Sequence, residues 1–320
     1  MPTVIDLDDI TVPDAKLLQA GLTHFGFYSG TMFGRPGPKT KDAYARYTSA
    51  SGPRGGEPPT PGALLTYPAT VMRELDFPGN IGQGATGHKA RRVQEWLTIH
   101  GQRTAIDEDF GPATARAVNA FQSAHGLTRT TGGEVDKPTW DELVSPMIRA
   151  FGKISPASSY DVTVRAIAEQ HLREHPIELG GANCGPWVRA YMDGNQGRAW
   201  PWCAGFVTFV LKQAAQIQGG SPPIKGSFSC DVLQRQAEQN GRFAEGRSIA
   251  DLSTGGLGDC CVFLVRRTSS DWTHTGFAMD MDRSTFATIE GNTNDDGVRE
   301  GYEVCKRVRG GSKIDFIKIA

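Results

Sequence analysis

The sequence predicts an α+β protein in which small all-α three-helix modules precede a cysteine-bearing helix packed on a small antiparallel sheet. Three observations lead to this fold class. A helix–loop–helix pattern occurs twice in the first half of the chain. A buried helix over 202–218 follows, with Cys203 in its first turn. Strand patterns separated by Gly, Asp, Asn and Arg then succeed one another from 259 onward, as in an antiparallel meander.

Length and composition set the first limits. At roughly 100–200 residues per domain, 320 residues indicate two or three domains. A hydrophobic content of 38% can build real cores, and 39 Gly with 19 Pro indicate many loops and turns. The net charge of −1 gives no electrostatic argument for nucleic acid as a partner. The first 15 residues contain no Lys or Arg and no apolar stretch, so no signal peptide is expected, and no run has the ~18 apolar residues of a membrane helix.

An internal repeat organises the first half. GPKTKDAYARY (37–47) aligns with GPATARAVNAF (111–121), and QAGLTHFG (19–26) aligns with QEWLTIHG (94–101). The two alignments differ in shift by one residue, which a loop can absorb. We therefore expect a duplicated module.

The second copy predicts three helices. Residues 88–101 form the first helix, 112–126 form the second with Pro112 near its start, and 136–148 form the third with Asp136 as N-cap. The apolar stripe of the first helix follows the i, i+3, i+4, i+7 pattern and consists of Val93, Trp96, Leu97 and His100.

The run FG-x-x-T-x-x-A-V-x-x-F (110–121) resembles the signature of peptidoglycan-binding modules of the three-helix type. The resemblance implies such a module over 84–150 and attachment to bacterial cell wall. The alternative is a small helical spacer, because most motif residues are core or turn residues. Residues 1–78 resemble a degenerate copy, which has GTMFGRPG in place of the loop with Asp107 and Asp109 and continues into the Pro/Gly-rich stretch 49–62.

The second half, 155–320, contains all six cysteines and predicts the chemistry. An amphipathic helix over 162–175 precedes the helix over 202–218, in which Pro201 is expected at N1. The unpaired N–H groups and the dipole of a helix start stabilise the thiolate form of a cysteine. The five expected strands are 259–267, 273–282, 285–292, 303–308 and 313–319.

A nucleophile, a base and an orienting group follow in order along these elements. Cys203 lies on the helix, and His274 lies at the start of the second strand. Glu290 and Asn292 are two residues apart on the next strand, so both are expected on one face. A thiol nucleophile needs an imidazole for its proton, and the imidazole needs a polar partner that fixes its tautomer. We favour Glu290 over Asn292 as that partner.

Four short motifs in this order resemble the CHAP-type cysteine amidohydrolases and peptidases, which have a papain-like fold and cut amide bonds in peptidoglycan. The motifs are PWCAGFV, GDCCVFLV, HTGF and IEGN. The resemblance covers about 160–320 and implies catalytic roles for Cys203, His274, Glu290 and Asn292. The sequence departs from the family pattern at Cys260 and Cys261 in the first core strand.

Further candidates are weaker. Trp200, Trp202 and Gly276 are candidate substrate-binding residues next to the expected nucleophile and base. No metal or other cofactor is expected, although Asp193 and Asn195 form a weak calcium candidate whose alternative is an Asx-turn. The five cysteines other than Cys203 are expected in the core or in disulfides.

These expectations define a peptidoglycan hydrolase: an N-acetylmuramoyl-L-alanine amidase or a stem or cross-bridge endopeptidase, acting as a phage endolysin or a secreted antibacterial effector. A non-catalytic wall-binding or virion-structural protein with a degenerate papain-like domain is the alternative. The expected partner is peptidoglycan, without nucleic acid or membrane insertion. We expect synthesis in the cytoplasm and action on the wall after holin-dependent lysis or through a secretion apparatus, an effector being paired with an immunity protein.

Overall fold

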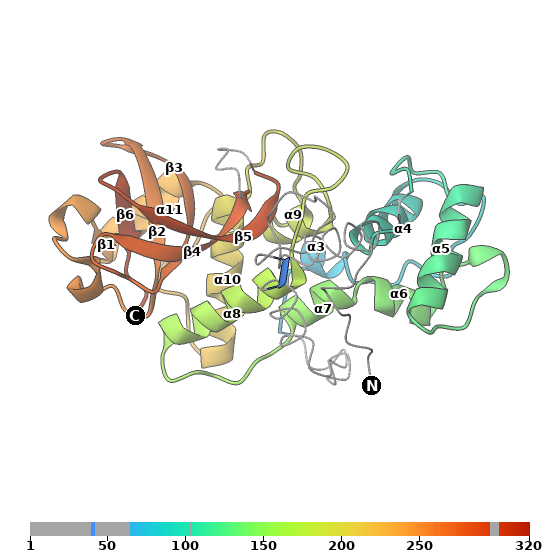
Figure 1. The fold of residues 1–320 in the computed structure, drawn as a ribbon, viewed down its shortest axis with the longest axis horizontal. Helices are drawn as coiled ribbons and strands as arrows, with labels where there is room; N and C mark the ends of the chain where they lie inside the picture. The colour runs from blue at the N-terminus through green and yellow to red at the C-terminus, as the bar shows by residue number, and fades with distance from the viewer. Residues whose placement is uncertain (1–39, 42–64, 103, 295–300) are drawn as a thin grey trace. The chain divides into compact units, whose positions relative to one another are not determined.

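The computed structural model of the chain describes residues 40–41, 65–102, 104–294 and 301–320. Two compact units divide the chain, Met1–Glu57 and Pro58–Ala320. The first unit lies almost entirely outside the described residues, and so does most of the first copy of the repeat. The following description concerns the second unit (Figure 1).

The helical module has the predicted helix–loop–helix order. Its helices are α4 (His88–Ile99), α5 (Pro112–Ala124) and α6 (Lys137–Leu143). The predicted apolar stripe forms its core, because Val93, Trp96 and Leu97 have no exposed surface. Asp136 caps α6 as expected, since its carboxylate accepts a hydrogen bond of 3.0 Å from the Thr139 N–H.

The predicted single helix over 136–148 is wrong at its end. Two helices occupy this stretch, α6 and α7 (Ser145–Phe151), and they meet at Val144. Pro146 lies in the first turn of α7. A proline has no N–H for the preceding turn, so the chain starts a new helix instead of continuing the old one.

The C-terminal half combines helices with an antiparallel sheet, which confirms the predicted α+β class. The helices are α8 (Tyr160–Glu174), α9 (Pro186–Tyr191), α10 (Cys203–Gln218) and α11 (Cys230–Gln239). The strands are β1 (Phe243–Ala244), β2 (Cys260–Thr268), β3 (Asp271–Met279), β4 (Thr285–Thr293), β5 (Glu303–Gly310) and β6 (Ile314–Ile317).

The sheet order is β1-β6-β2-β3-β4-β5. The meander prediction is confirmed for β2 to β5, which pair with their chain neighbours. The meander prediction is wrong for β6, which pairs with β2 and not with β5. The prediction also did not include β1, which pairs with β6. Hairpins are encoded by local turn residues, whereas the return of β6 joins strands far apart in the sequence.

Both faces of the sheet are covered. Helix α10 packs against β3, where the rings of Phe206 and Phe277 lie 5.8 Å apart. On the other face, Phe263, Phe286 and Phe316 form a second cluster with the segment that follows β1. Among the described residues, none of the helices combines the length and apolarity required to span a membrane.

The stretch 65–77, which the sequence assigns to the first module, packs on the C-terminal helices. The Tyr67 ring stacks on Phe209 of α10 at 5.3 Å, and its hydroxyl donates to the Phe151 carbonyl at 3.0 Å. The short helix α3 (Ala69–Met72) follows. Arg189 of α9 connects this stretch to α4. Its guanidinium pairs with Glu74 of the stretch at 2.7 Å and with Glu95 of α4 at 2.6 Å.

Candidate active site

Cys203 is the first residue of α10, a 16-residue helix whose N-cap is Trp202. The Phe206 N–H donates to the Trp202 carbonyl at 2.9 Å, which fixes the helix start. The expectation of Pro201 at N1 is therefore wrong, because Pro201 precedes the N-cap. The thiol accepts a hydrogen bond from the Ala204 N–H, one of the free donors of the first turn. Cys203 is 4% exposed, so its sulfur is largely shielded from water.

Trp202 has a structural position and not a substrate-binding one. Its side chain is fully buried and stacks on Tyr191 at 5.6 Å between ring centroids. Its indole N–H donates to the Glu178 carboxylate at 2.8 Å. A side chain without exposed surface offers nothing to a ligand, which corrects the expectation for Trp202. It anchors the residue that precedes the thiol.

Gly291 lets β4 approach the start of α10. A Cβ atom at this position would lie 2.7 Å from Cζ3 of Trp202 and 2.9 Å from Cβ of Phe206. Such distances are too short for carbon atoms, so only glycine fits without displacement. The close approach brings the strand that carries Glu290 next to the helix that carries Cys203.

His274 of β3 bridges the nucleophile candidate and a carboxylate. Its Nε2 lies 2.8 Å from Oε2 of Glu290 on β4. Its ring also interacts electrostatically with the Cys203 thiol, since each of the two groups shifts the pKa of the other. Because Nε2 is engaged by Glu290, Nδ1 is the nitrogen left for the sulfur. The structure thus brings Cys203, His274 and Glu290 together in one chain of contacts.

Asn292 does not join this chain. The pairing of β4 with β5 is irregular between Glu290 and Thr293, and Asn292 takes a left-handed backbone conformation with φ of 55°. Its side chain is buried, and its Oδ1 has no hydrogen-bond partner among the described residues. The expected shared face of Glu290 and Asn292 is wrong because the bulge changes the direction of the side chain.

Arg309 of β5 is a site residue that sequence analysis missed. Its guanidinium holds the Glu290 carboxylate with two hydrogen bonds of 2.5 and 2.6 Å. The same guanidinium lies over the Phe263 ring at 5.3 Å. Thr288 adds a third donor to Glu290 at 2.6 Å. The alternation of basic residues along 305–310 was the visible signal, but it looks like an ordinary solvated strand face.

The electrostatics favour a thiolate–imidazolium pair. Burial opposes ionisation of Glu290, but the hydrogen bonds from Arg309 and His274 outweigh it and lower the pKa of this carboxyl to about 2. Burial also opposes a charge on His274, yet its hydrogen bonds to Cys203 and Glu290 raise the imidazole pKa to about 9. The pKa of Cys203 lies well below its usual value, through hydrogen bonds from Cys230 and His274.

A second thiol faces the first one. Cys230 is the first residue of α11, and its Sγ lies 4.0 Å from Sγ of Cys203. Its hydrogen bond to Cys203 and its burial raise the pKa of Cys230 well above the usual value, so it is the neutral donor of the pair. All six cysteines of the chain are described, and none of them forms a disulfide with another. Cys230, Cys260, Cys261 and Cys305 lie in the core. The core was one of the two places expected for these cysteines, and disulfides were the other.

Substitution of Glu290 by glutamine is expected to shift the pH dependence of alkylation of Cys203 by iodoacetamide. The carboxylate favours the charged imidazole, so its loss lowers the His274 pKa from about 9. Because the charged imidazole lowers the pKa of Cys203, a less charged imidazole raises the pKa of the thiol, and the acid limb of the labelling rate moves to higher pH. Measurement of the labelling rate from pH 3 to 10 checks this result. An acid limb that stays in place in Glu290→Gln would contradict the role of Glu290.

The other substrate-binding candidates have different outcomes. Trp200 is half-buried, and its ring meets Phe228 edge-on at 6.3 Å. Phe228 is 38% exposed and lies two residues before Cys230, so this ring pair offers an apolar surface near the thiols. Gly276 instead makes room for packing, since a Cβ there would lie 2.8 Å from Cε1 of Phe263. Its expected substrate contact is corrected to a packing role.

The calcium candidates have protein partners. The Asp193 carboxylate accepts a hydrogen bond from the Thr70 hydroxyl, and the Asn195 amide donates to the Met192 carbonyl at 2.9 Å. Asp193 has a left-handed backbone conformation with φ of 53°. Within the described parts of the chain, no three His, Cys, Asp or Glu side chains gather so that they could hold a metal ion.

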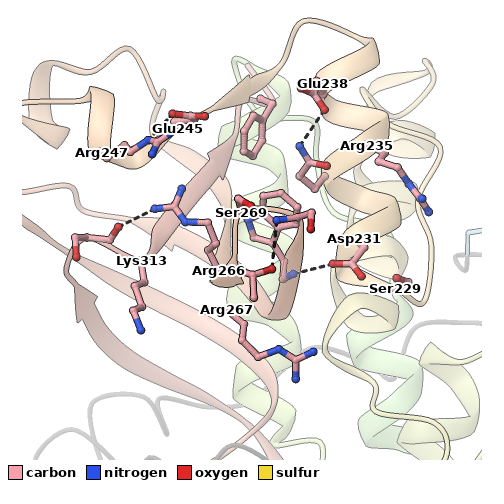
Figure 2. Close-up of a pocket in the computed structure, with 16 residues that line it drawn as sticks. Ser229, Asp231, Arg235, Glu238, Glu245, Arg247, Arg266, Arg267, Ser269 and Lys313 are labelled. Carbon is pink, nitrogen blue, oxygen red and sulfur yellow. Dashed lines mark hydrogen bonds and ion pairs between the residues drawn. The ribbon is translucent and has the colours of Figure 1, made fainter.

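A polar cavity of about 840 Å³ lies between α11 and the β2–β3 hairpin (Figure 2). Its wall includes Ser229, next to Cys230, and Trp272, two residues before His274. Among the described residues, the side chains of Arg235 and Lys313 in this wall have no ion-pair partner, and they project from opposite sides. Other cations of the wall are paired, as Arg266 is with Asp315 at 3.0 Å. Two free cations suit an anionic ligand group such as a carboxylate.

Two comparisons with known proteins find similar sequences. Residues 86–143 match the model of a peptidoglycan binding domain family. The zinc D-Ala-D-Ala carboxypeptidase of Streptomyces albus G is 26% identical over 196 residues, which cover 59% of this chain and 67% of that protein. No solved structure matches the chain.

These results define the class: an α+β protein related to peptidoglycan, with a helical peptidoglycan-binding module over 86–143. The name of the similar carboxypeptidase includes zinc. The described residues contain no group of three His, Cys, Asp or Glu side chains that fits such an ion.

Proposed function

We propose that the protein is a cell wall hydrolase that cleaves an amide bond of peptidoglycan through Cys203, His274 and Glu290. The observation that carries the proposal is the hydrogen bond of 2.8 Å between His274 and the buried Glu290, with the Cys203 thiol at the start of α10 near enough to the imidazole to shift its pKa. The match of residues 86–143 supports peptidoglycan as the partner. The order of helix, β3 and β4 supports a papain-like arrangement of the CHAP type.

The mechanism follows from the protonation states. The Cys203 thiolate attacks the amide carbonyl carbon, and the Cys203 N–H at the helix start is placed to stabilise the oxyanion. The His274 imidazolium then gives its proton to the leaving amine, and a thioester remains on Cys203. Neutral His274 takes a proton from water, which attacks the thioester and releases the carboxylic acid. Glu290 holds the imidazole in position and favours its charged form.

The other parts of the chain serve the same substrate. The module over 86–143 holds the enzyme at the wall and raises the effective concentration of substrate. The ring pair of Trp200 and Phe228 provides an apolar contact beside the thiols. Arg235 and Lys313 provide positive charge for carboxylates of a peptide stem. Both a phage endolysin and a secreted antibacterial effector would use this chemistry, after lysis or dedicated secretion.

Product analysis tests the proposal. We expect the purified protein to release soluble fragments from purified peptidoglycan, with one new amine for each bond cut. Mass spectrometry of the fragments then distinguishes an amidase, which separates the muramoyl group from alanine, from an endopeptidase, which cuts within the peptides. Sedimentation with peptidoglycan and no new amines would favour the alternative of a non-catalytic wall-binding protein.

A further inference from the structure

Two helices of the catalytic half begin with a cysteine, and their starts face each other. Cys203 opens α10, Cys230 opens α11, and the two sulfurs are 4.0 Å apart. The residues are 4% and 7% exposed. The proposed hydrolysis uses only Cys203, so the second thiol has no role in it beyond its hydrogen bond. The proposed hydrolysis therefore does not explain why the Cys230 thiol lies next to the nucleophile.

We propose that Cys203 and Cys230 form a reversible disulfide, which makes this pair the oxidation site of the protein and switches the proposed hydrolase off. The sulfurs have to approach by about 2 Å to reach a bond length of about 2.05 Å. The loss of hydrolysis in the oxidised state rests on the proposed function. The disulfide itself does not, since it depends only on the two neighbouring thiols.

The oxidant is a peroxide, and the reaction balances in two steps. The Cys203 thiolate attacks one oxygen of hydrogen peroxide, the O–O bond breaks, and Cys203 becomes a sulfenic acid. The hydroxide released takes the proton of the His274 imidazolium and leaves as water. The Cys230 sulfur then attacks the sulfenic sulfur, an S–S bond forms, and the hydroxyl group leaves with the Cys230 proton as a second water. Two thiols are oxidised, and one peroxide is reduced to two waters.

The environment assigns the two roles. Cys203 accepts hydrogen bonds from Ala204 and Cys230 and contacts the charged His274, which makes it the reactive thiolate. Cys230 donates to Cys203, so its sulfur is already directed at the atom that becomes oxidised. A thiol in this place intercepts the sulfenic acid before a second peroxide converts it irreversibly to a sulfinic acid.

The experiment treats the reduced full-length protein, as wild type and as each variant, with two equivalents of hydrogen peroxide, because conversion of one thiol to a sulfinic acid consumes two peroxides. In wild type we expect the intact mass to fall by about 2 Da and a peptide map to contain the peptides of Cys203 and Cys230 linked by a disulfide. Dithiothreitol should restore the original mass and the alkylation of Cys203 by iodoacetamide. In Cys230→Ser we expect a gain of about 32 Da on Cys203 that dithiothreitol does not reverse. Cys184→Ser, which removes a half-buried thiol elsewhere, is the matched control and should behave like wild type.

Two results would overturn the proposal. One is a wild-type protein that accumulates the sulfinic acid as readily as Cys230→Ser, and the other is a disulfide that joins a different pair. The mass map of wild type decides the question even where Cys230→Ser fails to fold. A disulfide in a protein whose reduced form releases no amines from peptidoglycan would contradict the proposed function and leave the oxidation site standing.

Discussion

Replacing Cys203 with alanine is expected to lower the release of amines from peptidoglycan by about four orders of magnitude or more, to the background rate. The thiolate forms the covalent bond of the proposed mechanism, and no other thiol contacts His274 among the hydrogen bonds of the site. Amine release and turbidity of purified peptidoglycan measure the effect. Sedimentation with peptidoglycan should remain unchanged, because Cys203 lies outside residues 86–143, which match the peptidoglycan binding domain.

The matched control is Cys184→Ala. Cys184 is half-buried, and within the described residues its thiol donates to the Ala182 carbonyl at 3.4 Å, away from His274. We expect this variant to keep the activity of wild type. Full lysis by Cys203→Ala would refute the proposed mechanism. If Cys203→Ala lost both sedimentation and lysis, the substitution would instead have damaged the fold.

Replacing Arg189 with methionine is expected to lower the free energy of unfolding by about 3–5 kcal/mol. Arg189 connects α9 to Glu74 and to Glu95 of α4, and the side chains of these acids are only 7% and 0% exposed. Methionine would leave the buried Glu74 carboxylate without the cation that pairs with it, and Glu95 with Arg91 alone, at 2.9 Å. Chemical denaturation monitored by tryptophan fluorescence measures the change. Trp96 on α4 and Trp187 on α9 lie on the two helices that Arg189 connects, with ring centroids 6.2 Å apart.

Two controls separate this effect from charge alone. Lys137 and Asp141 form an ion pair whose side chains are 55% and 49% exposed, so Lys137→Met should change stability by less than about 1 kcal/mol. The triple variant Arg189→Met, Glu74→Gln, Glu95→Gln should regain part of the lost stability, because it removes the unpaired charges. A change below about 1 kcal/mol in Arg189→Met would contradict the importance of this buried ion-pair cluster.

Much of the local structure was predictable because its signals are local. The apolar stripe of α4, the cap at Asp136 and the hairpin strands β2 to β5 each depend on a few neighbouring residues. Predictions were less accurate where neighbouring segments compete. Pro146 divides an expected helix, and the bulge before Thr293 turns Asn292 away from the face of Glu290.

Sequence patterns alone identified one helical module with a peptidoglycan-binding signature, then a helix with Cys203 at its start and strands carrying His274 and Glu290 in order. These features are periodicities, caps and short motifs, which the chain encodes within a few residues.

Only the tertiary structure decided the surroundings of the thiol. Arg309 reaches Glu290 from β5, and Cys230 reaches Cys203 from α11, 27 positions along the chain. Trp202, beside the nucleophile in sequence, turned into the core. Contacts between distant segments depend on how the strands register and how the helices pack, and short-range sequence patterns carry no record of that geometry.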